Sequence, residues 1–187
     1  KRIDPQARLI FNDYVSRSFI GYLENTTSPY NQNYLNRVIT EVNNIIKSNY
    51  SIVRHQEDKE DVLNIYKREG YFDKYNVLQY REDNKVNYYN CDGYIDYMYG
   101  YMLPSTGYIK DYVIKLHNPG FIVQYPRAEF GGEIPRFEDD PSFGKMIKKA
   151  WDWKDLCGVD NISSMNSFTN TKEYIQFINM CETKHND

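Results

Sequence analysis

Residues 75–125 constrain the fold most, because turn signals interrupt this segment at near-even intervals. Eleven of the nineteen tyrosines of the chain lie in it. Three of the four turn signals end in glycine, which accepts a positive φ without steric cost. Aromatic and β-branched side chains between the turns pack well on a pleated surface. The pattern is typical of an antiparallel meander. The turn signals are Glu82–Lys85, Asn90–Gly93, Pro104–Gly107 and His117–Gly120.

The spacing of these turns predicts five strands. Apolar bulk on both faces of the third strand indicates that it is central in the sheet and covered on both sides. The expected strands span residues 75–81, 85–90, 94–103, 108–116 and 120–125.

Helical periodicity precedes the predicted sheet. Asp4 and Pro5 are typical of a helix start, so we expect a first helix from Pro5 to about Gly21. Apolar residues at i, i+3, i+4 and i+7 predict a second helix over 35–46. A short strand at 51–54 and a third helix over 57–69 follow, the latter with acids in its first turn and bases in its last.

Two more helices are expected after the sheet. A loop spans 126–140, and Asp140 followed by Pro141 is typical of a helix start. Residues 156–168 lack periodicity, and the last helix is expected to begin at Asn170. The predicted fold class is α+β: a five-stranded, mostly antiparallel meander with an N-terminal helical layer and two C-terminal helices.

The absence of a linker or repeat predicts a single domain over residues 1–187. Its parts are a helical part at 1–70, a sheet at 71–126, and a loop with C-terminal helices at 127–187.

Composition narrows the classes of partner and compartment. The 187 residues carry a net charge of −3 from 23 basic and 26 acidic residues, well mixed, which argues against a nucleic-acid partner. No apolar run approaches the ~20 residues that span a bilayer. No signal-peptide pattern is present, and the three cysteines are too dispersed for a disulfide framework. We expect a cytoplasmic or virion protein with no membrane contact, cofactor or metal.

Asn90–Tyr97, with Leu103 and Pro104 downstream, resembles the nucleophile region of NlpC/P60 cysteine peptidases. The resemblance implies a cysteine hydrolase in which Cys91 is the nucleophile at a helix N-terminus. It also implies His117 as the base, and Gln124 is the candidate third polar group.

The residues after Cys91 also allow a different backbone. Tyr97, Tyr99 and Tyr101 alternate with period two, which favours a strand and places Cys91 in a turn. A 3.6-residue period also fits part of this segment, so the helix implied by the resemblance stays an alternative.

A metal-dependent nuclease or a nucleic-acid-binding module is the second alternative. Asp92, Asp96, Asp111 and Lys115 could gather at strand ends, where carboxylates and a lysine surround Mg²⁺ in such enzymes. Asp111 and Lys115 point to one face of a strand but lie about 13 Å apart along it.

The tyrosine excess supports the leading hypothesis, a non-enzymatic structural or assembly subunit that acts through protein–protein contacts. Such a subunit would belong to a virion or another large complex, with protein partners or further copies of itself. Tyrosine and tryptophan are enriched at protein interfaces. The expected interaction surface consists of Tyr97, Tyr99, Tyr101, Tyr108, Tyr112 and Trp153.

Overall fold

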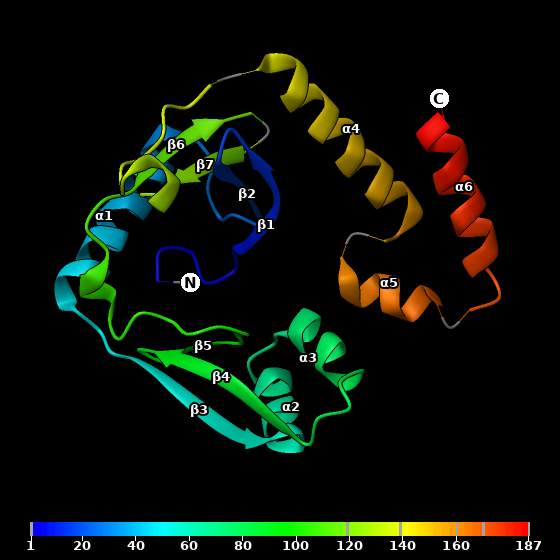
Figure 1. Cartoon of the computed structure of the whole chain (residues 1–187), viewed down its shortest axis with the longest axis horizontal. Helices are drawn as coiled ribbons and strands as arrows, with labels where there is room; N and C mark the ends of the chain where they lie inside the picture. The colour runs from blue at the N-terminus through cyan, green and yellow to red at the C-terminus, as the bar shows by residue number, and fades with distance from the viewer. Residues whose placement is uncertain (1, 119, 139, 160, 170, 187) are drawn as a thin grey trace. The chain divides into compact units, whose positions relative to one another are not determined.

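Helices and strands are mixed along the chain, and the fold class is α+β, as predicted (Figure 1). The computed structural model describes residues 2–118, 120–138, 140–159, 161–169 and 171–186. The strands are β1 (Arg8–Val15), β2 (Ser18–Glu24), β3 (Ile52–Asp58), β4 (Lys85–Cys91), β5 (Tyr94–Asp96), β6 (Val113–His117) and β7 (Gly120–Gln124). The helices are α1 (Gln32–Ser48), α2 (Lys59–Arg68), α3 (Phe72–Gln79), α4 (Pro141–Cys157), α5 (Ile162–Thr169) and α6 (Tyr174–Asn186), with short 3₁₀ turns η1 (Thr106–Tyr108) and η2 (Ala128–Phe130).

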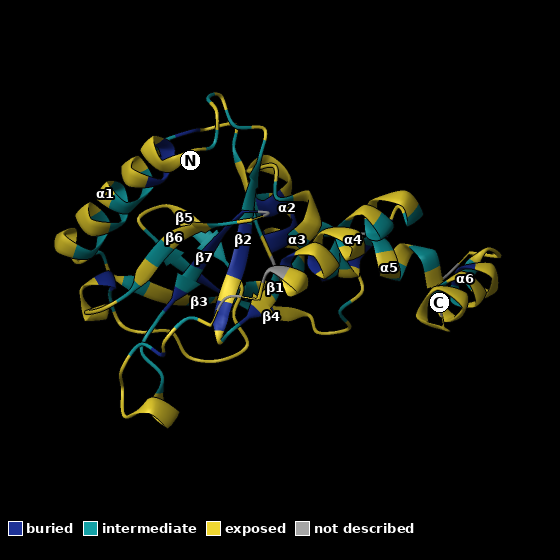
Figure 2. Ribbon diagram, turned by 90° about the horizontal axis from the view of Figure 1, so that it is seen from above, coloured by how far each residue is buried: buried dark blue, intermediate teal, exposed yellow. Residues whose placement is uncertain are grey.

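The four-stranded sheet has the order β1-β2-β7-β6, and each neighbouring pair is antiparallel. Its centre is the pair of strands β2 and β7, where Ile20 lies opposite Ile122 and both side chains are completely buried. Figure 2 shows the buried colour in the first half of β2, where Ser18, Ile20 and Gly21 are buried. This pair of strands forms the core on which the neighbouring strands are built.

The predicted first helix is wrong, because residues 8–24 form the β1–β2 hairpin. Ser16 and Arg17 make its two-residue turn at φ 43° and 58°. The rings of Phe11 and Phe19 meet edge to face at 6.2 Å on the sheet. Apolar residues in this segment fit both a helical and a pleated face, and pairing with β7 selects the strand.

The three-stranded sheet has the order β3-β4-β5, which confirms strands near 51–54 and 85–90. β4 and β5 form a tight hairpin in which Cys91 lies opposite Tyr94. Asp92 and Gly93 form its turn at φ 49° and 82°, the left-handed pair that two-residue hairpins prefer. The turn expected at Asn90–Gly93 is therefore present.

The five-stranded meander is wrong in its connectivity. β5 ends at Asp96, so the expected strand over 94–103 is mostly irregular chain. β6 and β7 pair with each other, and β7 pairs with β2, so they belong to the sheet that β1 and β2 complete. The expected strand over 75–81 is instead largely helix α3, because a short apolar run does not distinguish a strand from a buried helix.

Other helices follow their sequence signals closely. α1 confirms the second predicted helix, with the Asn31 side chain accepting the Tyr34 N–H at 3.1 Å as its N-cap. α2 confirms the third helix, and α4 begins at Pro141 as expected. The prediction of irregular chain at 156–168 is wrong where α5 forms, which gives three C-terminal helices within the described residues. The expected start of the last helix, Asn170, lies outside the described residues.

The chain divides into two compact units, each with its own buried residues. Unit 1 contains residues 1–53 and 89–147, and unit 2 contains 54–88 and 148–187. In unit 2, Val62 and Tyr66 of α2 are each only 1% exposed. The organisation of 1–187 as a single domain stays a prediction.

Candidate functional site

Residues 97–109, which we call the aromatic loop, contain four exposed tyrosines. Tyr99 is 79% exposed and Tyr101 87% exposed. No residue from 97 to 109 carries a charge. Large exposed apolar side chains gathered in one segment mark contact sites more often than ordinary surface. The other exposed members are Tyr97, Met98, Met102, Leu103, Tyr108 and Ile109.

Tyr89 of β4 fixes the first half of the aromatic loop. Its hydroxyl donates to the carbonyl of Gly100 at 3.0 Å and accepts the N–H of Met102 at 3.3 Å. The Tyr89 side chain is buried, so water competes little for these bonds. Within the loop, the rings of Tyr97 and Tyr99 meet edge to face at 5.8 Å.

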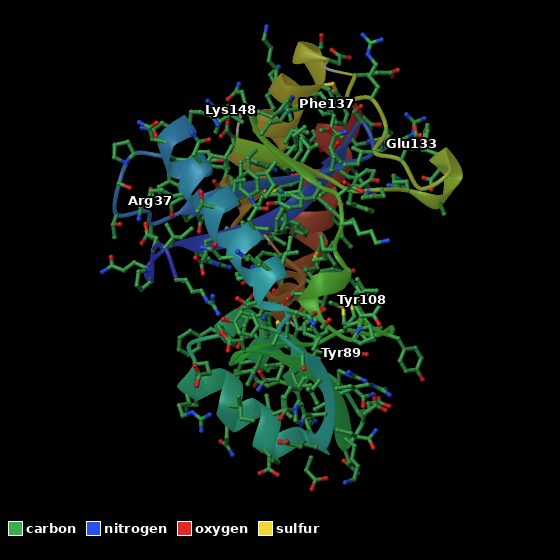
Figure 3. The ribbon with its side chains drawn as sticks, turned by 90° about the vertical axis from the view of Figure 1, so that its left-hand side faces the viewer. Arg37, Tyr89, Tyr108, Glu133, Phe137 and Lys148 are labelled. Carbon is green, nitrogen blue, oxygen red and sulfur yellow. The ribbon has the colours of Figure 1, made fainter. Side chains whose placement is uncertain are left out.

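Asn49, just after α1, fixes the second half. Its side-chain oxygen accepts the Ser105 hydroxyl at 2.5 Å and the Gly107 N–H at 3.1 Å. A Cβ on residue 107 would overlap that oxygen, so glycine is required for this close approach. Figure 3 shows Tyr108 beside the C-terminal end of α1, where this attachment holds it.

Thr106 completes the attachment through a buried hydroxyl. The hydroxyl donates to the carbonyl of Ile45 at 2.8 Å and accepts the N–H of Tyr50 at 3.0 Å. The Thr106 N–H donates to the Tyr50 carbonyl at 2.9 Å. The aromatic loop is thus held at both ends by unit 1, and its tyrosines project from a fixed backbone.

Four of the six predicted contact residues lie in this loop: Tyr97, Tyr99, Tyr101 and Tyr108. Tyr112 does not present its hydroxyl to a partner, because that group donates to the Asn43 side chain at 2.7 Å. Burial raises the pKa of Tyr112. Tyr112, just before β6, therefore connects this strand to α1. Trp153, the sixth predicted contact residue, is half-buried on α4 in unit 2.

Cys91 is the last residue of β4, and a turn followed by β5 comes after it. The helix that the peptidase resemblance implies after Cys91 is therefore replaced by a strand. Burial raises the pKa of the Cys91 thiol, and the neighbouring Asp92 raises it further, against an opposing effect of Arg2. Both effects disfavour the thiolate that a nucleophile needs.

The other two residues of the hydrolase hypothesis lie in the four-stranded sheet, whereas Cys91 lies in the three-stranded one. His117 ends β6 and packs edge to face on Phe137 at 5.3 Å. Gln124 ends β7, is buried, and donates from its side-chain amide to the Pro135 carbonyl at 2.9 Å. Gln124 thus holds the loop that follows β7.

The nuclease residues occupy separate local environments. Asp96 accepts the Tyr94 hydroxyl at 3.1 Å, and Asp92 pairs with Arg2. The ammonium of Lys115 lies 4.2 Å from the centre of the Phe137 ring. Asp111 is exposed just before β6. Across the described ranges, no group of three or more His, Cys, Asp or Glu side chains is arranged to hold a metal ion.

Sequence reasoning missed an aromatic cluster on the β1–β2 hairpin. Phe19 stacks on Tyr125 at 5.6 Å, and the Arg127 guanidinium lies 5.7 Å from the Tyr14 ring. Phe11, Tyr14 and Phe19 are each partly exposed. The period-two spacing of Leu9 and Phe11 is the sequence signal that indicates a strand here. The same residues also fit a helical face, which is why the segment was predicted to be a helix.

In the part of the chain that the structure describes, none of the helices has the length and apolar character needed to cross a bilayer. α4 instead carries exposed lysines at positions 145, 148 and 149.

Comparison with known proteins gives a partial similarity to one class of enzyme. No family model matches the chain. It is 27% identical over 110 residues to threonine–tRNA ligase of Desulfosudis oleivorans, 30% over 113 residues to that of Symbiobacterium thermophilum, and 27% over 112 residues to that of Streptococcus uberis. Each match covers 59% of this chain and 17% of the relative, so the matched segment spans about a sixth of each ligase.

Proposed function

We propose that this chain is a non-enzymatic recognition module that binds a protein partner through the aromatic loop. The observation that carries the proposal is the exposure of Tyr99 and Tyr101, at 79% and 87%, on a backbone held at both ends. Tyrosine offers a large amphipathic contact surface with few torsions to immobilise. A loop that is already ordered loses less conformational entropy on binding.

The absence of charge in the loop favours a protein over a polyanion. Phosphate backbones are bound by lysine and arginine, and residues 97–109 contain neither. Exposed Met98 and Met102 add polarizable side chains that adapt to an apolar partner surface. The loop composition therefore resembles the centre of a protein interface.

The proposed setting is a larger protein or complex in which this chain is one part. The matches to ligases that are about six times longer than the matched segment support an accessory part of a larger protein. A separate assembly subunit, of a virion or another large complex, would use the same loop. Binding of a further copy of the chain is the homo-oligomeric form of this proposal.

The test places a photo-crosslinking phenylalanine analogue at Tyr101 and, in a matched control, at Tyr80. Tyr80 is 49% exposed and lies outside the aromatic loop. We expect a discrete crosslinked species from position 101, in extract of the native source or with the purified chain, and none from position 80. The crosslink should disappear in a Tyr99→Ala, Met102→Ala background. Equal crosslinking from both positions, or none from position 101, would contradict the proposal.

A contribution to tRNA binding is the second candidate, favoured by the three threonine–tRNA ligase matches. The exposed lysines of α4 are the side chains best suited to phosphates. This candidate predicts that Lys148→Glu, Lys149→Glu abolishes retention of bulk tRNA on a filter and flattens its salt dependence. Tyr101→Ala should reduce that retention little. No retention at 50 mM salt would remove this candidate and leave the protein-partner proposal standing.

A further inference from the structure

Arg2 joins three segments that are far apart in the sequence. Its guanidinium donates to the Glu41 carboxylate of α1 at 2.8 Å and pairs with the Asp92 carboxylate in the β4–β5 turn. It also lies 5.1 Å from the centre of the Tyr50 ring. One side chain therefore ties the start of the described chain to α1 and to a hairpin tip ninety positions away.

The next two residues bond to other parts of unit 1. Arg37 of α1 donates to the carbonyl of Ile3 at 3.4 Å. The buried Asp4 carboxylate accepts the N–H of Thr27 at 2.8 Å and the Tyr34 hydroxyl at 3.3 Å. Because Asp4 fixes the backbone on one side of Arg2, the guanidinium reaches both of its carboxylates from a constrained position. We call residues 2–4 the N-terminal clasp.

The hairpin tip is connected to the aromatic loop by a short covalent path. The turn at Asp92 and Gly93 leads into β5, which ends at Asp96, and the loop begins at the next residue. Tyr89, which holds Gly100 and Met102, lies on the other strand of the same hairpin. A displacement of the hairpin therefore moves both the start of the loop and its first attachment.

We propose that the N-terminal clasp fixes the β4–β5 hairpin against α1 through Arg2 and Asp92, and thereby sets how rigidly the aromatic loop is presented. The structural part of this inference concerns the free chain. The effect on partner binding rests on the proposed function. Charge pairing at Arg2 is exposed to solvent, so it is sensitive to salt, in contrast to the buried attachments at Tyr89 and Thr106.

The test compares Arg2→Ala with Arg8→Ala by amide hydrogen exchange of the segment 92–103. Arg8 is the matched control, because it pairs with Glu24 within the β1–β2 hairpin, at 3.8 Å. We expect exchange in 92–103 to become roughly two- to fivefold faster in Arg2→Ala, the range set by an exposed ion pair, and to stay unchanged in Arg8→Ala. Unchanged exchange in Arg2→Ala would overturn the inference.

Two further measurements separate the clasp from simple loss of stability. One molar NaCl should accelerate exchange of 92–103 in the wild-type chain and have little added effect in Arg2→Ala. Asp92→Asn should reproduce Arg2→Ala, and the double variant should be no worse than either single one. Additive effects of the two substitutions would mean that Arg2 acts elsewhere, and would also overturn the inference.

The binding consequence is read from crosslinking at position 101. With the clasp and the proposed function both correct, Arg2→Ala lowers the crosslinked yield while Arg8→Ala does not. Faster exchange in a chain whose wild type gives no crosslink would support the clasp and refute the proposed function. A strong crosslink that Arg2→Ala leaves unchanged would refute the control of binding by the clasp.

Discussion

The β1–β2 and β4–β5 hairpins share one turn geometry but reach it from different sequences. Both use two residues with positive φ, at 43° and 58° in the first turn and 49° and 82° in the second. The second turn contains Asp92-Gly93, a typical pair for this turn. The first contains Ser16-Arg17, which carries no such signal. Local sequence thus determines the β4–β5 hairpin, whereas pairing with β7 and burial of Ile20 determine the β1–β2 hairpin.

The largest expected effect is in the hairpin that depends on its packing. Ile20→Ala would remove a completely buried side chain opposite Ile122. We expect a loss of about 2–5 kcal/mol in the free energy of unfolding, measured by urea denaturation. Phe19→Ala, at the exposed neighbouring position of the same strand, should lower the free energy of unfolding by less. Similar losses for the two variants would mean that β2 is not the core strand of its sheet.

A smaller effect is expected where the chain after the β4–β5 hairpin is attached to α1. Thr106→Val keeps the shape of the side chain but leaves the Tyr50 N–H without its acceptor. We expect a loss of about 1–3 kcal/mol in the free energy of unfolding. Ser105→Ala, which removes an exposed hydroxyl bond to Asn49, is the control and should cost less. A harmless Thr106→Val would mean that water replaces the lost acceptor.

The two turns give a direct test of the comparison. Gly93→Ala places a Cβ at φ 82° and should cost about 1–2 kcal/mol in unfolding free energy. Arg17→Gly relieves the same type of strain but increases chain entropy and removes the contact with Phe130 at 5.0 Å. We expect a net change within about 0.5 kcal/mol for Arg17→Gly. If Arg17→Gly proves strongly stabilising, Ser16-Arg17 is a strained turn that packing overrides.

The smallest effect is a pH dependence at the base of the β1–β2 hairpin. The N–H of Thr27 is the main cause that holds the pKa of the Asp4 carboxyl below its usual range, and burial opposes it. The unfolded chain therefore takes up the proton first, at about pH 4. The stabilisation is present above that pH and is lost as pH falls through the lower folded pKa. We expect the difference in Tm between the wild type and Asp4→Asn to be positive at pH 7 and to shrink as pH falls below about 4. A difference that stays constant as the pH is lowered through the acidic range would contradict this cause.

Sequence alone predicted the elements whose signals are local. α1 has an apolar stripe with helical spacing, and the Asp92-Gly93 turn has its characteristic residues. The prediction for residues 8–24 was wrong because their apolar pattern fits both a helical and a strand period. Only the β2–β7 pairing decides between the two. That pairing joins positions about a hundred residues apart, which periodicity cannot detect.

The candidate site was predicted in part for the same reason. Tyrosine excess indicated Tyr97, Tyr99, Tyr101 and Tyr108, all of which are exposed. The attachments that order the loop come from Asn49 and Tyr89, whose roles depend on three-dimensional proximity. Arg2 gave no sequence signal, because its two carboxylates lie 39 and 90 positions away.

The chain passes from one compact unit to the other three times, after residues 53, 88 and 147. These crossings fall inside β3, β4 and α4, so hydrogen-bonded elements rather than linkers carry the chain across. No truncation at one point can therefore isolate either unit, because each consists of two separate stretches of the chain. A shortened gene product ending near residue 147 would keep unit 1 whole and deprive α2 and α3 of the C-terminal helices. Isolation of unit 1 therefore requires excision of the internal segment 54–88 as well as removal of residues 148–187.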